Sequence, residues 1–315
     1  MSTPPTVAGV GASSVRLPPG SWPSLLAFLD QRFPDVGRAV WLARLADGKV
    51  SDAETGTLKP EAAYVAGRLI HYYRELPPEA LIPFEAQILH RDAHLLVADK
   101  PHFLPTLPSG RFVQETLLTR LKRATGLDDL VPLHRLDRGT AGLVLFSVDP
   151  ATRGAYSALF AGRQIAKTYE ALAPTRDDLD LPRVRRSRIV AGTPFFLQQE
   201  VDGDPNAETR ISRLEVRGAA SLYQLEPVTG RKHQLRVQMA GLGIPIVNDD
   251  WYPTLTVAAD AEDDWSRPLK LLARRLAFAD PVTGDRQLRP VQPVRRAVDQ
   301  RIEMAGVVHQ RLPPR

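Results

Sequence analysis

The residues between positions 134 and 143 have the types and spacing of a chemically reactive site. The carboxylate of Asp137 follows His134 and Arg135 and precedes Arg138, on a turn that contains a glycine. The apolar run at 143–147 is short and rich in β-branched and aromatic residues, which predicts a buried strand. We therefore expect Asp137 on a loop that enters a rigid sheet, where reactive groups are commonly held. A structural alternative stays open, in which Asp137 pairs with Arg135 or Arg138 and braces the turn.

A second group of polar side chains lies at residues 229–240. A glycine-containing turn opens this segment, and Leu235, Met239 and Leu242 then recur at the spacing of a helix. Arg236 lies one position from that apolar stripe, at the margin of the buried face, from which a guanidinium can reach a pocket. The alternative is an exposed basic helix whose arginine and lysine side chains are only solvated.

The elements that must position these residues are mostly strands. The segment 165–172 alternates in polarity and places Lys167 and Tyr169 on one face of a strand. His90 and His94 have the spacing of a metal-binding pair only on a helix, and a turn separates them here, so we expect no metal site. Further strands are expected at 86–90, 94–98, 209–216 and 222–228, and a helix at 150–161.

The composition of the 315-residue chain narrows the chemistry. Its 43% hydrophobic and 24% charged residues are ordinary for a globular protein of one large or two modest domains. The chain has no cysteine, which excludes disulfides, thiolate nucleophiles and cysteine-bound metals. A net charge of +5 and a pI of about 9.6 favour a polyanionic partner such as nucleic acid.

The N-terminal residues lack the basic start and apolar core of a signal peptide. No apolar run approaches the roughly 18 residues that a membrane span needs. We therefore expect a cytoplasmic protein without a membrane partner.

Three segments are expected along the chain. Residues 1–20 are rich in proline, glycine and serine without periodicity, which predicts a flexible lead. Residues 21–78 contain two short helical stripes followed by short strands, and the proline pair at 77–78 indicates a joint between domains. Residues 79–315 form the second domain, with more strand than helix, so the expected fold class is α+β.

Taken together, the motifs resemble a known family. The run 134–143, the segment 167–169, and the runs 229–236 and 242–249 occur in the order and approximate spacing of the RluA-type pseudouridine synthases. The resemblance covers roughly residues 84–290, and it implies a catalytic domain with a mainly antiparallel sheet and flanking helices. The segment 24–73 is similar to the small α+β alpha-L RNA-binding module that precedes the catalytic domain in several members.

The resemblance also implies an activity. A pseudouridine synthase is an isomerase that modifies RNA: it breaks the C1′–N1 bond of a uridine, turns the uracil and rejoins it through C5, without a cofactor or a metal. Asp137 would supply the reacting carboxylate, and Arg236 the cation that keeps it ionised and aimed. Tyr169 would be the third catalytic residue, its ring packed on the uracil. Because the uridine must swing out of its stack, Arg135 would occupy the vacated place.

Further substrate contacts are expected from the residues around the two motifs. Those assigned to substrate binding are His134, Leu136, Lys167, Arg231, Lys232, His233 and Gln234, and the basic cluster Arg183, Arg185 and Arg186 adds candidates for phosphate contacts.

The expected partner is structured RNA. Large-subunit ribosomal RNA is preferred over transfer RNA, because an N-terminal module suits a large target, and the protein is expected to act as a monomer in ribosomal RNA processing. Two alternatives remain: an RNA-binding or ribosome-assembly factor without chemistry, and a glycoside hydrolase. The hydrolase would need a second carboxylate beside Asp137, and none stands out in the sequence.

Overall fold

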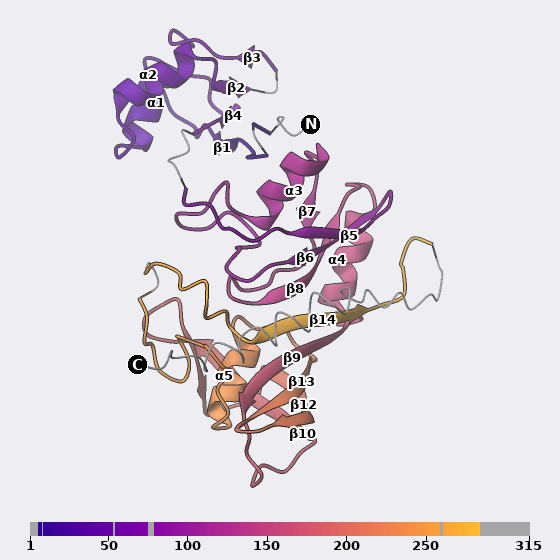
Figure 1. The fold of residues 1–315 in the computed structure, drawn as a ribbon. Coiled ribbons are helices and arrows are strands. Elements are labelled where there is room, and N and C mark those ends of the chain that lie inside the picture. The colour runs from indigo at the N-terminus through magenta and orange to yellow at the C-terminus, as the bar shows by residue number, and fades with distance from the viewer. Residues whose placement is uncertain (1–5, 8, 53, 75–78, 259–260, 284–315) are drawn as a thin grey trace, which may run out of the picture. The chain divides into compact units, whose positions relative to one another are not determined.

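The computed structural model describes residues 6–283 except 8, 53, 75–78 and 259–260 (Figure 1). Contacts within the chain divide it into two units, which are described separately. Unit 1 comprises residues 1–80 and 108–129, and unit 2 comprises residues 81–107 and 130–315. Among the described residues, no helix is both long enough and apolar enough to cross a membrane.

Unit 1 is built on a four-stranded antiparallel sheet of order β1-β4-β2-β3. The helical stripes expected in residues 22–45 form two helices, and the first begins where the Ser24 hydroxyl accepts a hydrogen bond from Ala27 N at 3.1 Å. Their apolar faces bury Leu29 and Trp41 completely. The elements of unit 1 are β1 (Ser13–Arg16), α1 (Leu25–Arg32), α2 (Arg38–Ala46), β2 (Val50–Asp52), β3 (Gly56–Thr57), β4 (Leu69–Tyr72) and α3 (Leu117–Thr125).

Unit 1 differs from the expected organisation in two places. Residues 13–16, expected in a flexible lead, form β1, which pairs with β4 in the register Ser13 to Tyr72. Its partner is distant in sequence, so local composition does not reveal this strand. Residues 108–129 group with unit 1, although we expected them in the second domain. The carboxylate of Glu79 accepts hydrogen bonds from three successive N–H groups of residues 113–115. The proline pair at 77–78 lies outside the described residues.

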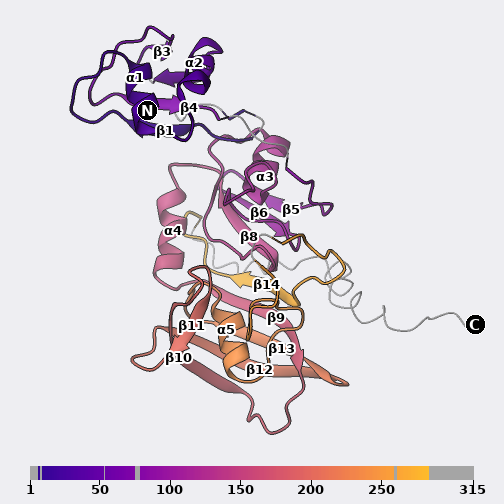
Figure 2. The same cartoon turned by 90° about the vertical axis from the view of Figure 1, so that its left-hand side faces the viewer.

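Unit 2 contains a ten-stranded sheet of order β11-β10-β12-β13-β9-β14-β8-β6-β5, with β7 paired to β8. Every neighbouring pair is antiparallel except β14 and β8, so the expected mainly antiparallel α+β class is confirmed. Figure 2 shows β6, β8, β14, β9, β13 and β12 following one another in this order through unit 2. Its elements are β5 (Gln87–Arg91), β6 (Leu95–Lys100), β7 (Val131–Pro132), β8 (Ala141–Ser147), α4 (Arg153–Ala161), β9 (Ala166–Pro174), β10 (Arg183–Ala191), β11 (Gln198–Val201), β12 (Ala207–Arg217), β13 (Ala220–Pro227), α5 (Gln234–Gly241) and β14 (Leu271–Ala277).

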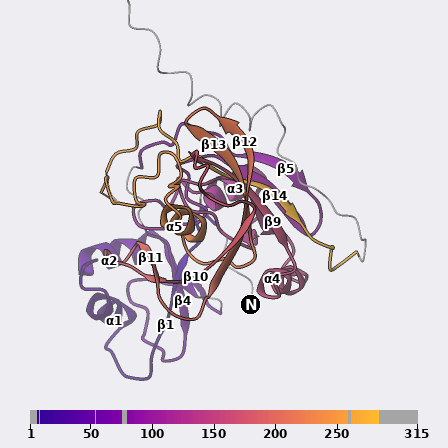
Figure 3. The ribbon, with the colours of Figure 1, turned by 90° about the horizontal axis from the view of Figure 1, so that it is seen from below.

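The two helices in the described part of unit 2 cover different parts of the sheet and stand apart in Figure 3. Helix α4 buries Tyr156 and Leu159 in a cluster with residues of β6 and β8. Helix α5 buries Leu235 and Met239 in a second cluster, with residues of β9, β12 and β13. The apolar stripe expected on α5 therefore packs as predicted, and it fixes the rotation of the helix that carries Arg236.

Gly142 lies where the parallel strands β8 and β14 meet. It pairs with Ala273, and its φ of +112° is a conformation that side chains rarely adopt. A Cβ atom at this position would lie 2.3 Å from the carbonyl oxygen of Ala273. The strand that follows the Asp137 loop therefore needs a glycine to approach β14.

Gly142→Ala is expected to lower the free energy of unfolding by more than about 3 kcal/mol, because both the backbone angle and the contact oppose a side chain. Urea unfolding of the purified variant measures the change. Gly154→Ala is the matched control: Gly154 is exposed on α4 with open space around it, so the substitution should stabilise by roughly 0.5–1 kcal/mol. Equal effects of the two substitutions would contradict the prediction.

Candidate active site

The loop that carries Asp137 connects β7 to β8 and is fixed through its backbone. The Asp137 carbonyl oxygen accepts a hydrogen bond from Thr140 N at 3.1 Å, which closes a turn. Three side chains at and beyond the end of β6 donate to the carbonyl oxygens beside it. Thr106 Oγ1 reaches residue 136 at 2.9 Å, Lys100 Nζ reaches residue 138 at 3.1 Å, and His102 Nδ1 reaches residue 139 at 2.7 Å. The Asp137 side chain nevertheless stays 30% exposed, so a substrate can reach it.

Arg236, in the first turn of α5, faces this carboxylate. Its Nη1 lies 3.8 Å from Asp137 Oδ2, and the arginine side chain is only 8% exposed. The two arginines next to Asp137 in the sequence do not brace it: Arg138 is paired with Asp263, and the Arg135 side chain is exposed. The two sequence motifs therefore meet at one carboxylate, as the resemblance implied.

Asp249 completes the arginine's environment, and our sequence reasoning did not include it among the site residues. Its carboxylate accepts from Arg236 Nε at 2.8 Å and from Nη2 at 2.7 Å, and its side chain is fully buried. Oδ1 also accepts from the backbone N–H groups of Trp251 and Tyr252. The guanidinium lies 5.1 Å from each of these two aromatic rings, within cation–π range. Arg236 is thus held in one orientation, with Nη1 turned to Asp137.

A second acid therefore does lie close to Asp137, contrary to the sequence argument against a glycoside hydrolase. Both oxygens of Asp249 are engaged by the guanidinium and by backbone N–H groups. A carboxylate bound in this way positions its partner and has no free oxygen to serve as the second acid or base of that reaction.

His233 approaches Asp137 from the start of α5. Its Nε2 lies 3.9 Å from Asp137 Oδ1, and its Nδ1 is 2.7 Å from the hydroxyl of Tyr252. The same hydroxyl accepts from Gln198 N, and burial raises the pKa of Tyr252 to about 12, so we assign the Tyr252 proton to the bond with Nδ1. Burial lowers the pKa of His233 to about 4, so the ring is neutral near pH 7 and presents Nε2–H to Asp137.

Tyr169 lies on β9, between Leu225 of β13 and Ala273 of β14. Its ring is half-buried against the apolar cluster below α5. Burial, followed by the negative charge of Asp137, raises the pKa of the Tyr169 hydroxyl well above its ordinary value. The structure therefore brings the phenol within electrostatic reach of Asp137 and keeps it protonated at neutral pH.

Three of the residues assigned to substrate binding serve the fold itself. His134 Nε2 accepts a hydrogen bond from Leu145 N at 3.1 Å, and its ring stacks on Phe160. Leu136 is buried, only 8% exposed, in the loop that carries Asp137. Gln234 is fully occupied by hydrogen bonds, with Oε1 accepting from Thr229 Oγ1 and the backbone at 231, and Nε2 donating to residues 208 and 209.

The remaining predicted contacts are arranged around the start of α5. Lys167 Nζ donates to the carbonyl oxygen of Thr229 at 3.0 Å, which ties β9 to the turn before the helix. Arg231 and Lys232 are exposed at that turn. In the basic strand β10, Arg185 pairs with Glu200, and Arg186 pairs with Glu208 while staying 60% exposed.

Two histidines with lowered pKa values, His134 and His233, predict sensitivity to acid. Burial, with the charge of Lys167, lowers the pKa of His134 to about 3, and burial lowers that of His233 to about 4. Both would titrate near about 6.5 in the unfolded chain, which therefore binds more protons than the folded chain below that pH. We expect the free energy of unfolding to fall by about 1–2 kcal/mol per histidine between roughly pH 6.5 and pH 5, measured by urea unfolding.

The same titration in His134→Gln and His233→Gln should give shallower slopes, since each variant removes one of the protons taken up on unfolding. Slopes equal to that of the wild type in both variants would refute this assignment.

As an assembly, the site presents one accessible carboxylate between a fixed cation and a neutral imidazole N–H, with a phenol close by. Such a carboxylate can attack an electrophilic carbon or accept a proton, with its charge directed by the guanidinium. Among the described residues, no group of three or more histidine and acidic side chains could hold a metal ion.

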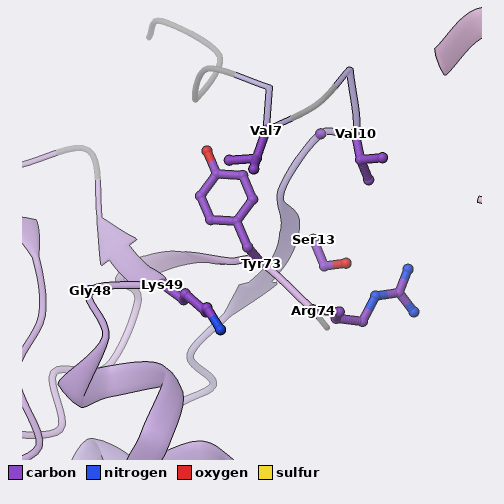
Figure 4. Close-up of a pocket in the computed structure, with 8 residues that line it drawn as sticks. Val7, Val10, Ser13, Gly48, Lys49, Tyr73 and Arg74 are labelled. Carbon is purple, nitrogen blue, oxygen red and sulfur yellow. The ribbon is translucent and has the colours of Figure 1, made fainter. Parts of the chain in front are cut away.

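Unit 1 contains a separate pocket of about 260 Å³, shown in Figure 4. Apolar groups, among them Val7, Val10 and the ring of Tyr73, supply most of its wall, and Lys49 and Arg74 add positive charge. None of the predicted site residues lines it. The lining residues are Val7, Val10, Gly11, Ser13, Gly48, Lys49, Tyr73 and Arg74.

Comparisons with known proteins indicate one family. Residues 94–241 match the family described as RNA pseudouridylate synthase. An uncharacterised RNA pseudouridine synthase of Synechocystis sp. is 30% identical over 72% of this chain and 79% of that protein. A dual-specificity RNA pseudouridine synthase of Pasteurella multocida is 31% identical over 63% of this chain and 89% of that protein. The solved structure of human RNA pseudouridylate synthase domain containing 1 is similar in fold, with a TM-score of 0.51, 21% identity, and coverage of 70% of this chain and 96% of that chain.

Proposed function

Because this chain belongs to the RluA-type RNA pseudouridine synthases, a family of isomerases, we propose that it converts particular uridines of structured RNA to pseudouridine at Asp137. The observation that carries the assignment of the site is the meeting of Asp137 with Arg236 at 3.8 Å, while Asp249 and the aromatic rings hold the arginine. A reactive carboxylate on a fixed loop, with a buried cation aimed at it, suits chemistry at a glycosidic carbon.

In this proposal the site residues have separate roles. The Asp137 carboxylate acts on the uridine, Arg236 and His233 direct it, and the Tyr169 ring packs against the uracil. The uridine swings out of its stack, at a cost of about a few kcal/mol, to reach the loop. Arg135 is exposed two residues from Asp137, which supports its role in filling the vacated stack. The isomerisation needs no cofactor in this scheme.

The RNA backbone is proposed to run past the start of α5. Arg231 and Lys232 are exposed there, next to His233, and the partly exposed Lys167 contacts the same turn. Cations at such positions bind phosphates regardless of sequence. His134, Leu136 and Gln234 support these contacts from within the fold, since their polar and apolar groups are engaged there.

The target we propose is large-subunit ribosomal RNA, ahead of transfer RNA, acted on by a cytoplasmic monomer. A separate N-terminal unit with its own core supports a large target, because a second RNA contact can select among distant sites. The Pasteurella relative is named as dual-specificity, so transfer RNA is the alternative target.

The proposal is tested by incubating the full chain with unmodified transcripts of ribosomal and transfer RNA and mapping pseudouridine by chemical derivatisation. We expect pseudouridine at one or a few positions of the ribosomal transcript. Pseudouridine only in transfer RNA would change the target but keep the activity. RNA binding without any pseudouridine would support a non-catalytic RNA-binding factor, and release of free uracil would support a hydrolase.

A further inference from the structure

Phe195 is the most exposed of the large hydrophobic side chains that the structure describes, at 85%. It lies in the short connection between β10 and β11, at 192–197. This connection is a defined turn: Gly192 N donates to Leu197 O at 3.0 Å, and Leu197 N donates to Pro194 O at 2.9 Å. The phenylalanine is therefore held out into solvent by an ordered backbone.

A row of aromatic rings joins Phe195 to the candidate active site. The rings of Phe195 and Phe196 are 5.8 Å apart, and those of Phe196 and Trp251 are 5.1 Å apart. Trp251 lies 5.4 Å from the His233 ring and 5.1 Å from the Arg236 guanidinium. The row thus begins in solvent and ends at the two groups that face Asp137.

The row is also tied to the site through the backbone. Gln198, the residue that ends the connection and begins β11, donates its N–H to the Tyr252 hydroxyl at 2.8 Å. That hydroxyl is the one bonded to His233. The position of the Phe195 turn and the position of the imidazole beside Asp137 therefore depend on one shared group.

We propose that Phe195, backed by Phe196 and Trp251, is a stacking subsite for the base of a nucleotide next to the reacting uridine. This inference rests on the proposed function, since it extends the same site along the RNA. An exposed phenylalanine in continuity with the catalytic groups gives a neighbouring base an apolar face, and aromatic stacking accepts any base. The exposed cation of Lys232, adjacent to His233, complements the phosphate of that nucleotide.

The continuity of this row with the active site favours RNA over a protein partner as its ligand. The exposed ring is not an isolated patch, because each ring in the row is in contact with the next until Arg236 is reached. A nucleotide chain whose uridine is held at Asp137 must leave the site on some side, and the row offers unpaired bases a place to stack as it does so.

The test uses full-length protein and a fluorescent single-stranded RNA of about ten nucleotides with one central uridine. Phe195→Ala is expected to weaken binding by about 5- to 150-fold, with an unchanged dependence of affinity on salt, because stacking is lost while phosphate contacts remain. Phe195→Trp should retain binding. Leu214→Ala is the matched control, since Leu214 is 49% exposed on β12 and does not belong to the row, and it should bind as the wild type does.

A second measurement locates the base. An abasic nucleotide placed on one side of the uridine should weaken binding to the wild type but not to Phe195→Ala. Equal affinities of wild type and Phe195→Ala for every RNA would overturn the inference. It would also be overturned if Phe195→Ala changed only self-association in sedimentation, which would assign the ring to a protein contact.

The binding readout does not require turnover, so the two proposals fail separately. Phe195-dependent binding without pseudouridine would retain the stacking subsite and remove the synthase activity. Pseudouridine formation with Phe195-independent binding would do the reverse.

Discussion

Asp137→Asn is expected to form pseudouridine at least about a thousandfold more slowly than the wild type, while folding with nearly unchanged stability. The amide has the shape of the carboxylate but cannot attack carbon or accept a proton in its place. Arg236 keeps its bidentate pair with Asp249 in this variant, so no buried charge is left alone. The Asp137 side chain is 30% exposed, and its loop is held by backbone hydrogen bonds that the substitution does not touch.

Single-turnover assays with excess enzyme on a responsive RNA measure this rate, and urea unfolding measures the stability. Asp177→Asn is the matched control: Asp177 is an 85% exposed surface acid paired with Arg213, and its loss should leave both quantities unchanged. An Asp137→Asn rate within about tenfold of the wild type would show that this carboxylate does not carry the chemistry.

Some features of the candidate site could be predicted from local sequence patterns. The strand after Asp137 is a short apolar run, and the helix bearing Arg236 has apolar residues at helical spacing, so the positions of both elements were predictable. The shared face of Lys167 and Tyr169 followed from alternation along one strand. The meeting of Asp137 with Arg236 required knowledge of the tertiary fold, which the family resemblance supplied.

The burial of Asp249 could not be predicted from local sequence patterns. Asp249 lies 13 residues beyond Arg236, in an irregular segment, and it is followed directly by a second acid, Asp250. No periodicity says which of the two carboxylates turns inward, because burial is decided by a loop that closes over the guanidinium. Lys100 is a similar case: a lysine at a strand end suggests solvent, yet its ammonium is buried and donates to three backbone carbonyl oxygens.

The sequence analysis missed two features of the fold whose contact partners are distant in the chain. Strand β1 has a single apolar side chain, Val15, and it becomes a strand only because β4 lies beside it. The segment 108–129 joins unit 1 although it follows two strands of unit 2 in the chain. Both errors concern contacts between distant segments, whose formation depends on the tertiary structure rather than on propensity.

The second large effect is expected at Asp249. Asp249→Leu leaves the guanidinium of Arg236 buried without its bidentate partner and removes the acceptor of two backbone N–H groups. We expect the free energy of unfolding to fall by about 3–5 kcal/mol, the usual cost of stranding a buried charge, and activity to fall with it. Because loss of folding alone would lower activity, this variant cannot by itself assign a positioning role to Asp249.

The double variant Arg236→Met/Asp249→Leu resolves that ambiguity. Removing both charges leaves an apolar pair in an apolar and aromatic setting, so urea unfolding should show recovery of most of the stability lost in Asp249→Leu. Pseudouridine formation should stay low, because the cation that directs Asp137 is gone. A double variant no more stable than Asp249→Leu would show that the pair is not energetically coupled. A stable and active double variant would show that Asp137 works without the guanidinium, which would remove Arg236 and Asp249 from the mechanism together.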